Sequence, residues 1–413
     1  MSTENNNILA GLDIGTSTVS ASIGKLHNDG TVEVIGIGSA SSTGIRHGLI
    51  VNIEAAVTAL RAAIVEAEQL ADRQITSAYV SINGEHIKSI NSQGNSPIRS
   101  REVSEIELEL ALESAKAIPL SNDECVVHVI PQEYVIDWQK GIREPLGMSG
   151  TRLDANVHLI TCAKNALLNV TKCVTSCDIT VREIVVEPLA SAASILSNDE
   201  RELGVCLLDI GGGTTDVAVY ADGAIRHTHV VPMAGDSVTR DIAMTFRTPA
   251  QHAEQIKIKY ACALQELTDN DETIHVQGVA NRPSTQIPRQ TLAAVVESRY
   301  REIFKIVQDS LEEAQISMER LGSGIILAGG AANMEGIVEL AEEVFHLPVS
   351  NGKPKNLVGL DDFHHSTAYT TCTGLLVWAV RSQKILSSND KAEQINGTSN
   401  PFNALKGWIR KTF

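Results

Sequence analysis

One short pattern occurs twice in this 413-residue chain and constrains its fold more than any other feature. The first copy reads Gly-Leu-Asp-Ile-Gly-Thr-Ser-Thr from Gly11, and the second reads Leu-Leu-Asp-Ile-Gly-Gly-Gly-Thr-Thr-Asp from Leu207. Asp13 and Asp209 occupy the same place in the two copies, 209 − 13 = 196 residues apart. Repetition at a domain-sized period predicts two related halves that face each other.

The rest of the chain alternates short Val/Ile/Leu-rich runs with longer helical patterns. Ile8–Ile14 and Val19–Lys25 predict paired strands around the first glycine turn. Ile53–Asp72 predicts a helix, and Ala78–Ile82 predicts a further strand. Because this alternation is typical of sheets covered by helices, we predict an α/β fold throughout.

Residues 84–163 differ from the flanking sequence in charge, proline content and hydrophobic pattern, which predicts a small inserted α+β unit. Arg99–Glu113 is dense in charge, and prolines punctuate the segment. Three strand-like runs surround one expected helix, namely Val126–Ile130, Tyr134–Trp138 and Val157–Cys162.

Each repeated turn has the composition of a phosphate-binding hairpin. Glycines let backbone N–H groups converge on an anion because no Cβ blocks the approach. Thr16–Thr18 in one copy, and Thr214 and Thr215 in the other, add hydroxyl donors. Asp13 and Asp209 are placed to hold Mg²⁺ through its waters, since that ion dehydrates reluctantly. A single copy would be explained as well by a plain tight turn, but two copies favour a pair that clasps a triphosphate.

A third glycine loop lies at Ile325–Asn333, where an apolar strand runs into Gly329 and Gly330 and then an expected helix. Paired glycines let a flat base lie against bare backbone, and a helix N-terminus is electropositive. Alone this signal is weak, because strand–glycine–helix connections occur throughout α/β proteins.

Two segments rich in small residues, Glu187–Ser194 and Thr371–Leu376, are predicted helices. Small residues let two helices approach closely, and a close crossing between the halves would serve as a hinge. Ordinary tight core packing explains them equally well.

Charge and cysteine content exclude several classes. The net charge of −16 argues against a nucleic-acid binder, which needs a basic face. Seven scattered cysteines complete neither a disulfide framework nor a zinc site. The first residues lack the features of a signal peptide, and no apolar run reaches the roughly 18 residues of a membrane span. We therefore expect a cytoplasmic protein.

The C-terminal segment is the exception to the acidic composition. Ser387–Asn400 is polar and predicts a flexible linker. Residues 401–413 then predict an amphipathic helix with three basic and no acidic side chains. A bulky apolar face with basic flanks suits an anionic membrane surface, and the alternative is a helix docked on the protein's own body. The residues concerned are Phe402, Leu405, Lys406, Trp408, Ile409, Arg410, Lys411 and Phe413.

Arg289–Lys305 carries four basic residues on an otherwise acidic chain. A helix from about Leu292 would place Arg299 and Glu302 on one face. The segment is either a solvated surface or a partner site for carboxylates, which the rigid fork of arginine recognises well.

Two Asp-Ile-Gly hairpins, a Gly-Gly loop and two small-residue helices, in this order, resemble the actin–Hsp70–hexokinase superfamily over nearly the whole chain. The inserted unit and the C-terminal segment make it similar to the FtsA family of bacterial cell-division proteins. The resemblance implies an actin-like two-lobed ATPase fold with an inserted α+β subdomain, called 1C, and a C-terminal amphipathic helix.

The resemblance also implies ATP and Mg²⁺ as cofactors. Glu187 lies where related ATPases position the attacking water, although at most weak hydrolysis is expected. Asp13 and Asp209 would hold the metal. The implied nucleotide residues are Asp13, Gly15, Thr16, Ser17, Thr18, Asp209, Gly211, Gly212, Gly213, Thr214, Thr215, Gly235, Asp236, Glu254, Lys257, Gly329, Gly330 and Asn333.

The implied division of the chain follows the family. It assigns 1–83 with 164–200 and 365–386 to subdomain 1A, 84–163 to 1C, 201–232 with 305–364 to 2A, 233–304 to 2B, 387–400 to a linker and 401–413 to a membrane-targeting helix.

The implied function is that of a polymerising protein at the cytoplasmic face of the inner membrane, which tethers FtsZ filaments at the division site. Subdomain 1C would recruit later division proteins. Two alternatives stay open: a pilus-assembly actin homologue and a small-molecule kinase of the same superfamily. The residues implied for binding the FtsZ C-terminal tail are Arg289, Arg299, Arg301 and Glu302.

Overall fold

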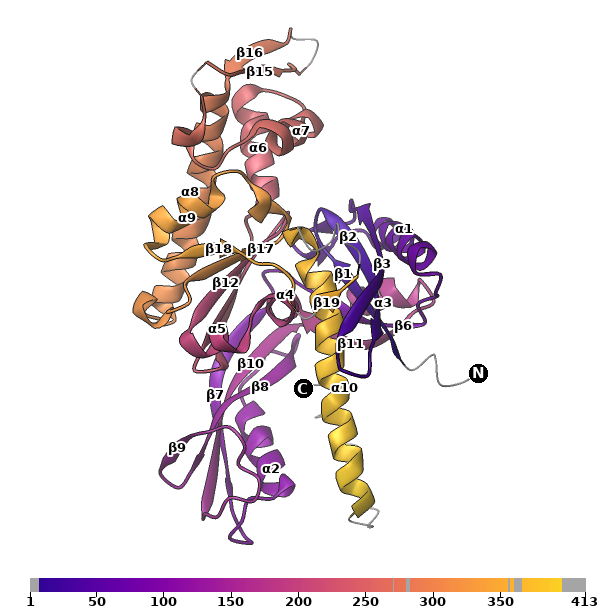
Figure 1. Cartoon of the computed structure of the whole chain (residues 1–413), viewed down its shortest axis with the longest axis vertical. Helices are drawn as coiled ribbons and strands as arrows, with labels where there is room; N and C mark the ends of the chain where they lie inside the picture. Colours follow the sequence, from indigo (N-terminus) through magenta and orange to yellow (C-terminus); the bar gives the residue numbers. More distant parts are fainter. Residues whose placement is uncertain (1–6, 270, 280–282, 356, 360–365, 396–413) are drawn as a thin grey trace.

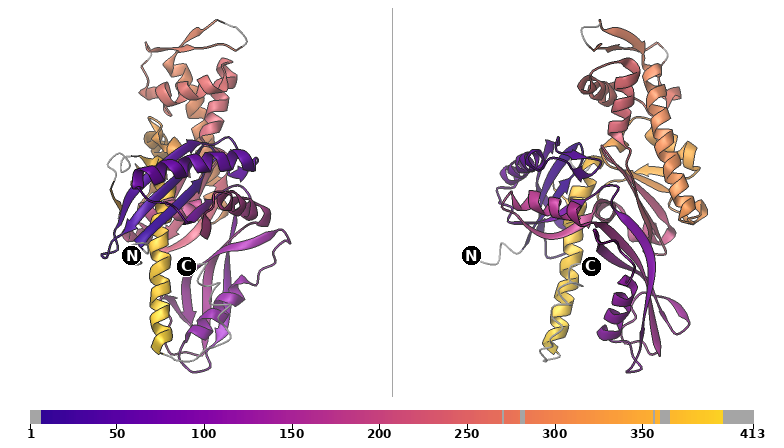
Figure 2. Two further views of the ribbon diagram at one scale, coloured as in Figure 1. Left: turned by 90° about the vertical axis from the view of Figure 1, so that its right-hand side faces the viewer. Right: turned by 180° about the vertical axis from the view of Figure 1, so that it is seen from behind.

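The computed structural model of the chain describes residues 7–269, 271–279, 283–355, 357–359 and 366–395. Two sheet-containing lobes lie side by side in the middle of the molecule (Figure 1). A mainly helical unit occupies one end of the long axis, and a sheet with one helix occupies the other. The views in Figure 2 show the same arrangement from two further sides.

The first lobe is built on a six-stranded sheet of order β11-β6-β1-β2-β3-β19. Its helix α1 begins where the Asn52 side chain accepts a hydrogen bond from the Ala55 N–H, and it buries a row of alanines against the sheet. The elements are β1 (Ile8–Ile14), β2 (Thr18–Leu26), β3 (Val32–Ser41), β4 (Ile45–Arg46), β5 (Leu49–Ile50), α1 (Ile53–Ala71), β6 (Ser77–Ile82), α3 (Lys164–Thr175), β11 (Thr180–Val186), α4 (Glu187–Ile195) and β19 (Leu357–Val358).

The second lobe is built on a five-stranded sheet of order β14-β13-β12-β17-β18, with the helical unit above it. Its elements are α5 (Asn198–Leu203), β12 (Val205–Ile210), β13 (Thr215–Ala221), β14 (Ala224–Val231), α6 (Gly235–Phe246), α7 (Ala250–Tyr260), β15 (Thr273–Val276), β16 (Thr285–Pro288), α8 (Arg289–Glu313), β17 (Ile325–Ala328), α9 (Ile337–Phe345) and β18 (Val349–Asn351). Short 3₁₀ turns lie at Gln265–Leu267, Met318–Arg320, Gly330–Asn333 and Thr367–Tyr369.

The predicted relation between the two halves is confirmed by their topology. In the first lobe β1 pairs antiparallel with β2 and parallel with β6, and β2 pairs antiparallel with β3. In the second lobe β12 pairs antiparallel with β13 and parallel with β17, and β13 pairs antiparallel with β14. Both repeated motifs are therefore β-hairpins in the same sheet context.

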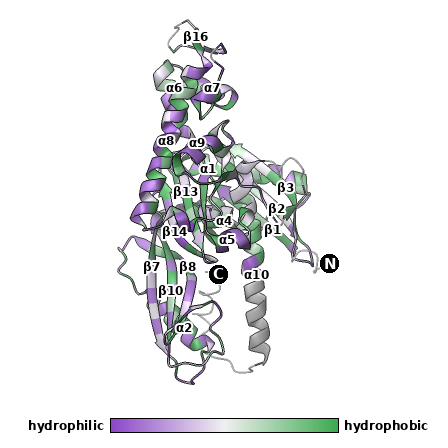
Figure 3. Ribbon diagram, turned by 60° about the vertical axis from the view of Figure 1, so that its left-hand side comes forward, coloured by the Kyte–Doolittle hydropathy of each residue, from purple (hydrophilic) through white to green (hydrophobic). Residues whose placement is uncertain are grey.

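The inserted unit is a four-stranded antiparallel sheet of order β7-β10-β8-β9, covered on one face by α2. Its strands mix hydrophobic and hydrophilic positions (Figure 3), as expected of a sheet with one buried face. Side chains of the sheet and of α2 form a small hydrophobic core of their own. The elements are β7 (Lys88–Pro97), α2 (Glu105–Lys116), β8 (Glu124–Ile136), β9 (Gln139–Ile142) and β10 (Arg152–Ala163).

One prediction inside this unit is wrong. We expected two strands separated at Pro131, but β8 runs through it as a single strand. The pairing with β10 shifts there, so that Asn156 faces Glu133 while Val157 faces Pro131. A proline is tolerated at such an irregularity because no ladder hydrogen bond from its nitrogen is needed. Trp138, expected at a strand end, lies beyond β8 in the turn to β9 and is 87% exposed.

Two helix boundaries also differ from expectation. Helix α8 begins at Arg289, directly after Pro288, rather than near Leu292. Helix α10 (Thr370–Ile395) continues through the first part of the expected linker 387–400. Extending an existing helix requires no new nucleation, and Lys391–Gln394 are strong helix formers. The rest of the expected linker, and the expected helix 401–413, lie outside the described residues.

Within the described residues, no helix is both long and apolar enough to cross a bilayer.

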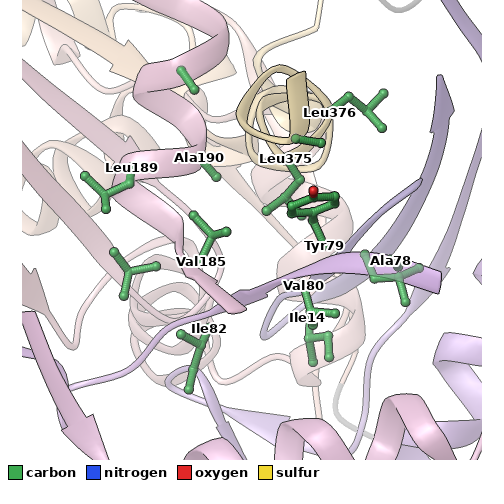
Figure 4. Close-up of a cluster of buried hydrophobic side chains, with 14 of the residues drawn as sticks. Ile14, Ala78, Tyr79, Val80, Ile82, Val185, Leu189, Ala190, Leu375 and Leu376 are labelled. Carbon is green, nitrogen blue, oxygen red and sulfur yellow. The ribbon is translucent and has the colours of Figure 1, made fainter. Parts of the chain in front are cut away.

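The expected close crossing of two small-residue helices is confirmed. In Figure 4, Leu375 and Leu376 of α10 lie above β6, with Leu189 and Ala190 of α4 on the adjacent side. A Cβ placed on Gly374 would lie only 1.9 Å from the Ala190 carbonyl oxygen. The absence of a side chain at Gly374 is therefore what allows α4 and α10 to touch.

Replacing Gly374 by alanine should destabilise the protein by about 2 kcal/mol, because the added methyl group forces the two helices apart. Helix propensity alone predicts the opposite sign, a gain of about 1 kcal/mol. The free energy of unfolding in urea decides between the two, and a gain would contradict the close crossing.

Candidate functional site

A cavity of about 570 Å³ lies between the two lobes, where both hairpins turn. Most of the residues predicted to bind a cofactor line it, together with the predicted catalytic residue. They are Asp13, Gly15, Thr16, Ser17, Thr18, Glu187, Asp209, Gly211, Gly212, Thr214, Gly235, Asp236, Glu254, Lys257, Gly329, Gly330 and Asn333.

The structure places two predicted residues elsewhere. Thr215 is buried in β13 and its hydroxyl donates to the Met233 carbonyl at 2.8 Å. It points away from Thr214 because successive residues of a strand face opposite sides. Gly213 packs against the first hairpin, where an added Cβ would lie 2.6 Å from Thr16 Oγ1.

The two hairpins touch each other across the entrance of the cavity. A Cβ on Gly212 would lie 1.9 Å from Ser17 Oγ, so only glycine fits opposite this serine. The Ser17 hydroxyl donates to Asp236 Oδ1 at 3.0 Å, at the start of α6 in the second lobe. His47 Nδ1 donates to the Gly213 carbonyl at 3.0 Å. These contacts hold the lobes together on the side where the glycine turns face each other.

Four carboxylates lie close together at the cavity: Asp209 and Asp216 are buried, and Asp13 and Glu187 are partly buried. Burial raises the pKa of Asp13 to about 7, and the charge of Asp209 adds to the rise. Burial likewise raises the pKa of Asp209. The pKa values of Glu187 and Asp216 are raised well above the usual range by burial, and the neighbouring carboxylates reinforce the effect. Such a cluster is costly unless protons or a cation neutralise it.

Asn83, at the end of β6, is the residue that connects these carboxylates. Its side-chain amide donates to Glu187, to Thr214 Oγ1 at 2.8 Å and to Asp216 Oδ2 at 2.6 Å. Sequence reasoning missed both Asn83 and Asp216 as site residues. The available signal was a polar residue directly after a buried strand that neighbours Asp13.

The amide of Asn83 does not satisfy every carboxylate oxygen. In the described part of the chain, Glu187 Oε1 and Asp216 Oδ1 are buried without a hydrogen-bond partner. Oxygen atoms of this kind suit a hard cation or the water bound to it. Among the described residues, no three His, Cys, Asp or Glu side chains converge as a direct ligand set. The unpaired oxygens of Glu187 and Asp216 fit a hydrated Mg²⁺, and the assignment of this ion to Asp13 and Asp209 stays a prediction.

Asp13 and Asp209 are each held by hydroxyl groups. Ser81 Oγ donates to Asp13 Oδ1 at 2.7 Å. Asp209 Oδ2 accepts hydrogen bonds from Ser191 of α4 and from Thr371 of α10, the latter at 3.1 Å. The two crossing helices thus each contribute a hydroxyl to the same buried carboxylate, which links the crossing to the site.

The other end of the cavity is lined by α7 and by the third glycine loop. Lys257 Nζ lies 2.8 Å from Glu254 and donates to the Gly235 carbonyl at 3.1 Å. The helix expected directly after Gly330 is instead a 3₁₀ turn, and α9 begins later, at Ile337. The electropositive helix end predicted for the loop is therefore not at the glycines.

The arginines predicted to bind a partner lie on α8, outside the set that lines the cavity. Arg299 pairs with Asp241 at 2.6 Å and with Glu302, which confirms that Arg299 and Glu302 share a face. Arg301 pairs with Glu297 at 2.8 Å and with Glu343 at 2.9 Å.

Arg289 pairs with Glu272 at 3.0 Å and with Glu335. All three arginines are thus engaged within the protein. Their acidic partners Glu302 and Glu343 are about half exposed, at 53% and 54% of the side chain.

Comparison with known proteins identifies close relatives over the full length. Residues 206–374 match the family described as "Cell division protein FtsA", and residues 84–161 match the "SHS2 domain inserted in FTSA". The chain is 48% identical to the cell division protein FtsA of Pseudomonas aeruginosa, covering all of both chains. It is 43% identical to FtsA of Neisseria meningitidis, covering 97% of this chain and 98% of that protein. Identity to FtsA of Escherichia coli is 41%, covering 98% of each.

Solved structures confirm the actin-like fold predicted from the sequence. The chain resembles one from the PilM–PilN type IV pilus biogenesis complex with a TM-score of 0.65, 15% identity and coverage of 90% and 98% of the two chains. It resembles MreB5 of Spiroplasma citri bound to ADP with a TM-score of 0.53, 18% identity and coverage of 95% and 100%. At these identities the likeness shows the fold alone.

Substituting Asp13 by asparagine should stabilise the protein without nucleotide, in a pH-dependent way. As pH rises from 3.8 towards about 7, the unfolded chain ionises at this position before the folded protein does, and wild type loses stability. The variant has no such loss, so its advantage should grow from about 1 kcal/mol near pH 4.5 to at most about 4 kcal/mol near pH 7.5. Urea unfolding in EDTA across this range measures it.

The matched control is Asp72→Asn, an exposed carboxylate in the same lobe. It should change the unfolding free energy by less than about 0.5 kcal/mol. If the difference in unfolding free energy between Asp13→Asn and wild type stayed constant or fell as pH rises, the raised pKa of Asp13 would be contradicted.

Proposed function

This chain belongs to the FtsA family of cell division proteins, and we propose that it is an actin-like, ATP-binding protein that tethers FtsZ filaments to the cytoplasmic membrane. The pilus-assembly and kinase alternatives have less support, because the relatives at 41–48% identity are cell division proteins across their whole length. The proposal has three parts, which concern the nucleotide, the membrane and FtsZ.

The observation that carries nucleotide binding is the pair of hairpins of like topology that meet over one cavity. Backbone N–H groups of both glycine turns, with the hydroxyls of Thr16–Thr18 and Thr214, would bind the phosphates. Lys257 and Glu254 would contact the ribose, and Gly329 with Gly330 would lie against the base. The MreB5 structures of this fold were solved with ADP and with AMPPNP.

Mg²⁺ would neutralise phosphate charge, held by Asp13 and Asp209 through its waters. Glu187 would orient a water towards the terminal phosphate. Burial and the neighbouring carboxylates raise the pKa of Glu187, which favours its protonated form, and a protonated carboxyl group is a poor base. Slow hydrolysis is therefore the expected behaviour, and the nucleotide serves mainly to join the two lobes and favour polymerisation.

Membrane attachment is assigned to residues 401–413, on the basis of their composition. The segment carries Lys406, Arg410 and Lys411 beside five bulky apolar side chains and has no acidic residue. A helix this short binds weakly alone, so polymers that present many copies would bind far more tightly. The protein would then be peripheral to the inner membrane, with subdomain 1C free to recruit later division proteins.

FtsZ binding is assigned to helix α8, at Arg289, Arg299, Arg301 and Glu302, where Arg299 faces Asp241 of α6 and Arg301 faces Glu343 of α9. The half-exposed Glu302 and Glu343 are the carboxylates that an acidic FtsZ tail would displace from the arginines. Because one carboxylate replaces another, each guanidinium group stays paired, and binding the tail costs little desolvation of the arginines.

Ser17→Ala should weaken ATP binding about tenfold, because the hydroxyl that donates to Asp236 would turn to the phosphate and the variant lacks that charge-assisted hydrogen bond. Thr215→Val is the matched control, since that hydroxyl donates to the Met233 carbonyl. It should leave the Kd within about twofold even if stability falls by about 1 kcal/mol. A fluorescent ATP analogue measures both, and equal losses in the two variants would count against the assigned phosphate site.

Flotation with anionic vesicles tests the anchor, comparing the full chain with one ending at Ser399. Only the full chain should float, and Mg·ATP should increase the bound fraction if polymers supply multivalency. Equal flotation of both chains would show that residues 400–413 are not the anchor.

Arg299→Ala/Arg301→Ala should weaken binding of an acidic FtsZ tail peptide at least about tenfold, and added salt should weaken the wild type in the same direction. Lys305→Ala is the control on the same helix, where the lysine pairs with Asp309. Anisotropy of a labelled peptide reports the Kd, and an unchanged value for the double variant would place the FtsZ site elsewhere.

A further inference from the structure

Helix α2 of the inserted unit has an outer face with an unusual composition. It buries Ala111, Leu112 and Ala115 against the sheet, while Ile106 and Leu110 on the opposite side are 63% and 50% exposed. These two side chains lie one helical turn apart and so form a continuous apolar strip. We call this strip, with Glu105, Glu109 and Glu113 beside it, the α2 outer face.

The α2 outer face is acidic as well as apolar. Helix α2 contains four glutamates and one lysine, which gives a net charge of 1 − 4 = −3. Glu107 is buried in the capping box with Ser104, so the other three glutamates and Lys116 leave a net charge of 1 − 3 = −2 on the rest of the helix. Lys116 pairs with Glu113 and its side chain is only 12% exposed.

One segment of this chain has the complementary chemistry. Residues 401–413 have a net charge of +3, with no acidic side chain. In a helix that turns about 100° per residue, their apolar side chains gather within one arc. As a helix these 13 residues would be about 20 Å long, close to the roughly 18 Å of the 12 residues of α2.

The described chain ends on the side of the molecule where the inserted unit lies (Figures 1 and 2). Helix α10 runs from the lobe crossing towards the end of the molecule where the inserted unit lies (Figures 1 and 2). Helix α2 covers the side of the inserted sheet that faces α10 in these views. From Ile395, residues 396–400 span up to about 17 Å when extended. This is the reach available to residues 401–413 from the end of α10.

We propose that residues 401–413 dock on the α2 outer face when no membrane is present, and that an anionic membrane competes with α2 for them. The proposal rests on the anchor role assigned above, since the membrane is the competitor. Docking would hide the apolar side chains of the single molecule in solution. It would also keep unassembled copies off the membrane, so that multivalent polymers attach selectively.

Hydrogen exchange over residues 105–116 tests docking directly. It should be slower in the full chain than in the chain ending at Ser399, by about fivefold, because docking stabilises the helix against opening. Vesicles of phosphatidylglycerol and phosphatidylcholine should remove the difference. Equal exchange in the two chains without vesicles would overturn the proposal, and protection that persists on vesicle-bound protein would overturn the competition.

A pair of variants tests whether docking limits membrane binding. Ile106→Lys/Leu110→Lys in the full chain should raise vesicle binding several-fold, because the docked state is lost. The matched control is Val65→Lys/Leu168→Lys, which adds the same charge at exposed apolar positions of α1 and α3, 49% and 61% exposed. An equal rise in both variants would reflect general charge and overturn the proposal.

The failure of the anchor role is distinguishable from the failure of docking. If no full-length chain binds vesicles, the anchor role fails, and the exchange comparison without vesicles still decides whether the segment docks. If the full chain binds vesicles but α2 exchanges equally with and without residues 400–413, the anchor role stands and docking fails.

Discussion

The close approach of four buried or partly buried carboxylates between the lobes is the constraint on which the rest of the structure depends. Asp13 and Asp209 come from the two repeated hairpins, Glu187 begins α4, and Asp216 lies on β13. Asn83 and three hydroxyl groups satisfy part of their hydrogen-bonding capacity, and in the part of the chain that the structure describes two of their oxygens are buried and unpaired. A protein that keeps such a cluster buried loses stability unless a ligand compensates, which is typical of a functional site.

The cluster also explains why distant elements are connected. Asp209 accepts hydrogen bonds from both crossing helices, α4 and α10, at the point where Gly374 lets them touch. Helix α10 begins there and ends at the opposite end of the molecule from the α6–α7 unit (Figure 1). A change in the distance between the lobes would therefore act on the base of the helix that leads to residues 396–413. This gives the proposed nucleotide site a physical route to the proposed anchor.

Much of the fold could be predicted because the informative residues are local in sequence. The Asp-Ile-Gly repeats predicted both hairpins, and the small residues predicted the crossing at Gly374. The site residues that were misassigned or missed are those whose roles depend on contacts with distant parts of the chain. Thr215 and Thr214 are adjacent and chemically alike, and only the strand alternation separates their roles. Asn83 stands alone in the sequence, and its importance arises from three acceptors contributed by distant segments.

Magnesium and nucleotide together are proposed to complete the carboxylate cluster between the lobes. The most direct test of this proposal is the free energy of unfolding of the full chain in Mg·ATP, in ATP with EDTA and in Mg²⁺ alone. Mg·ATP at a hundred times its Kd should stabilise the protein by about 2.7 kcal/mol, and each component alone should give far less. Equal stabilisation with and without Mg²⁺, or none in Mg·ATP, would contradict the account.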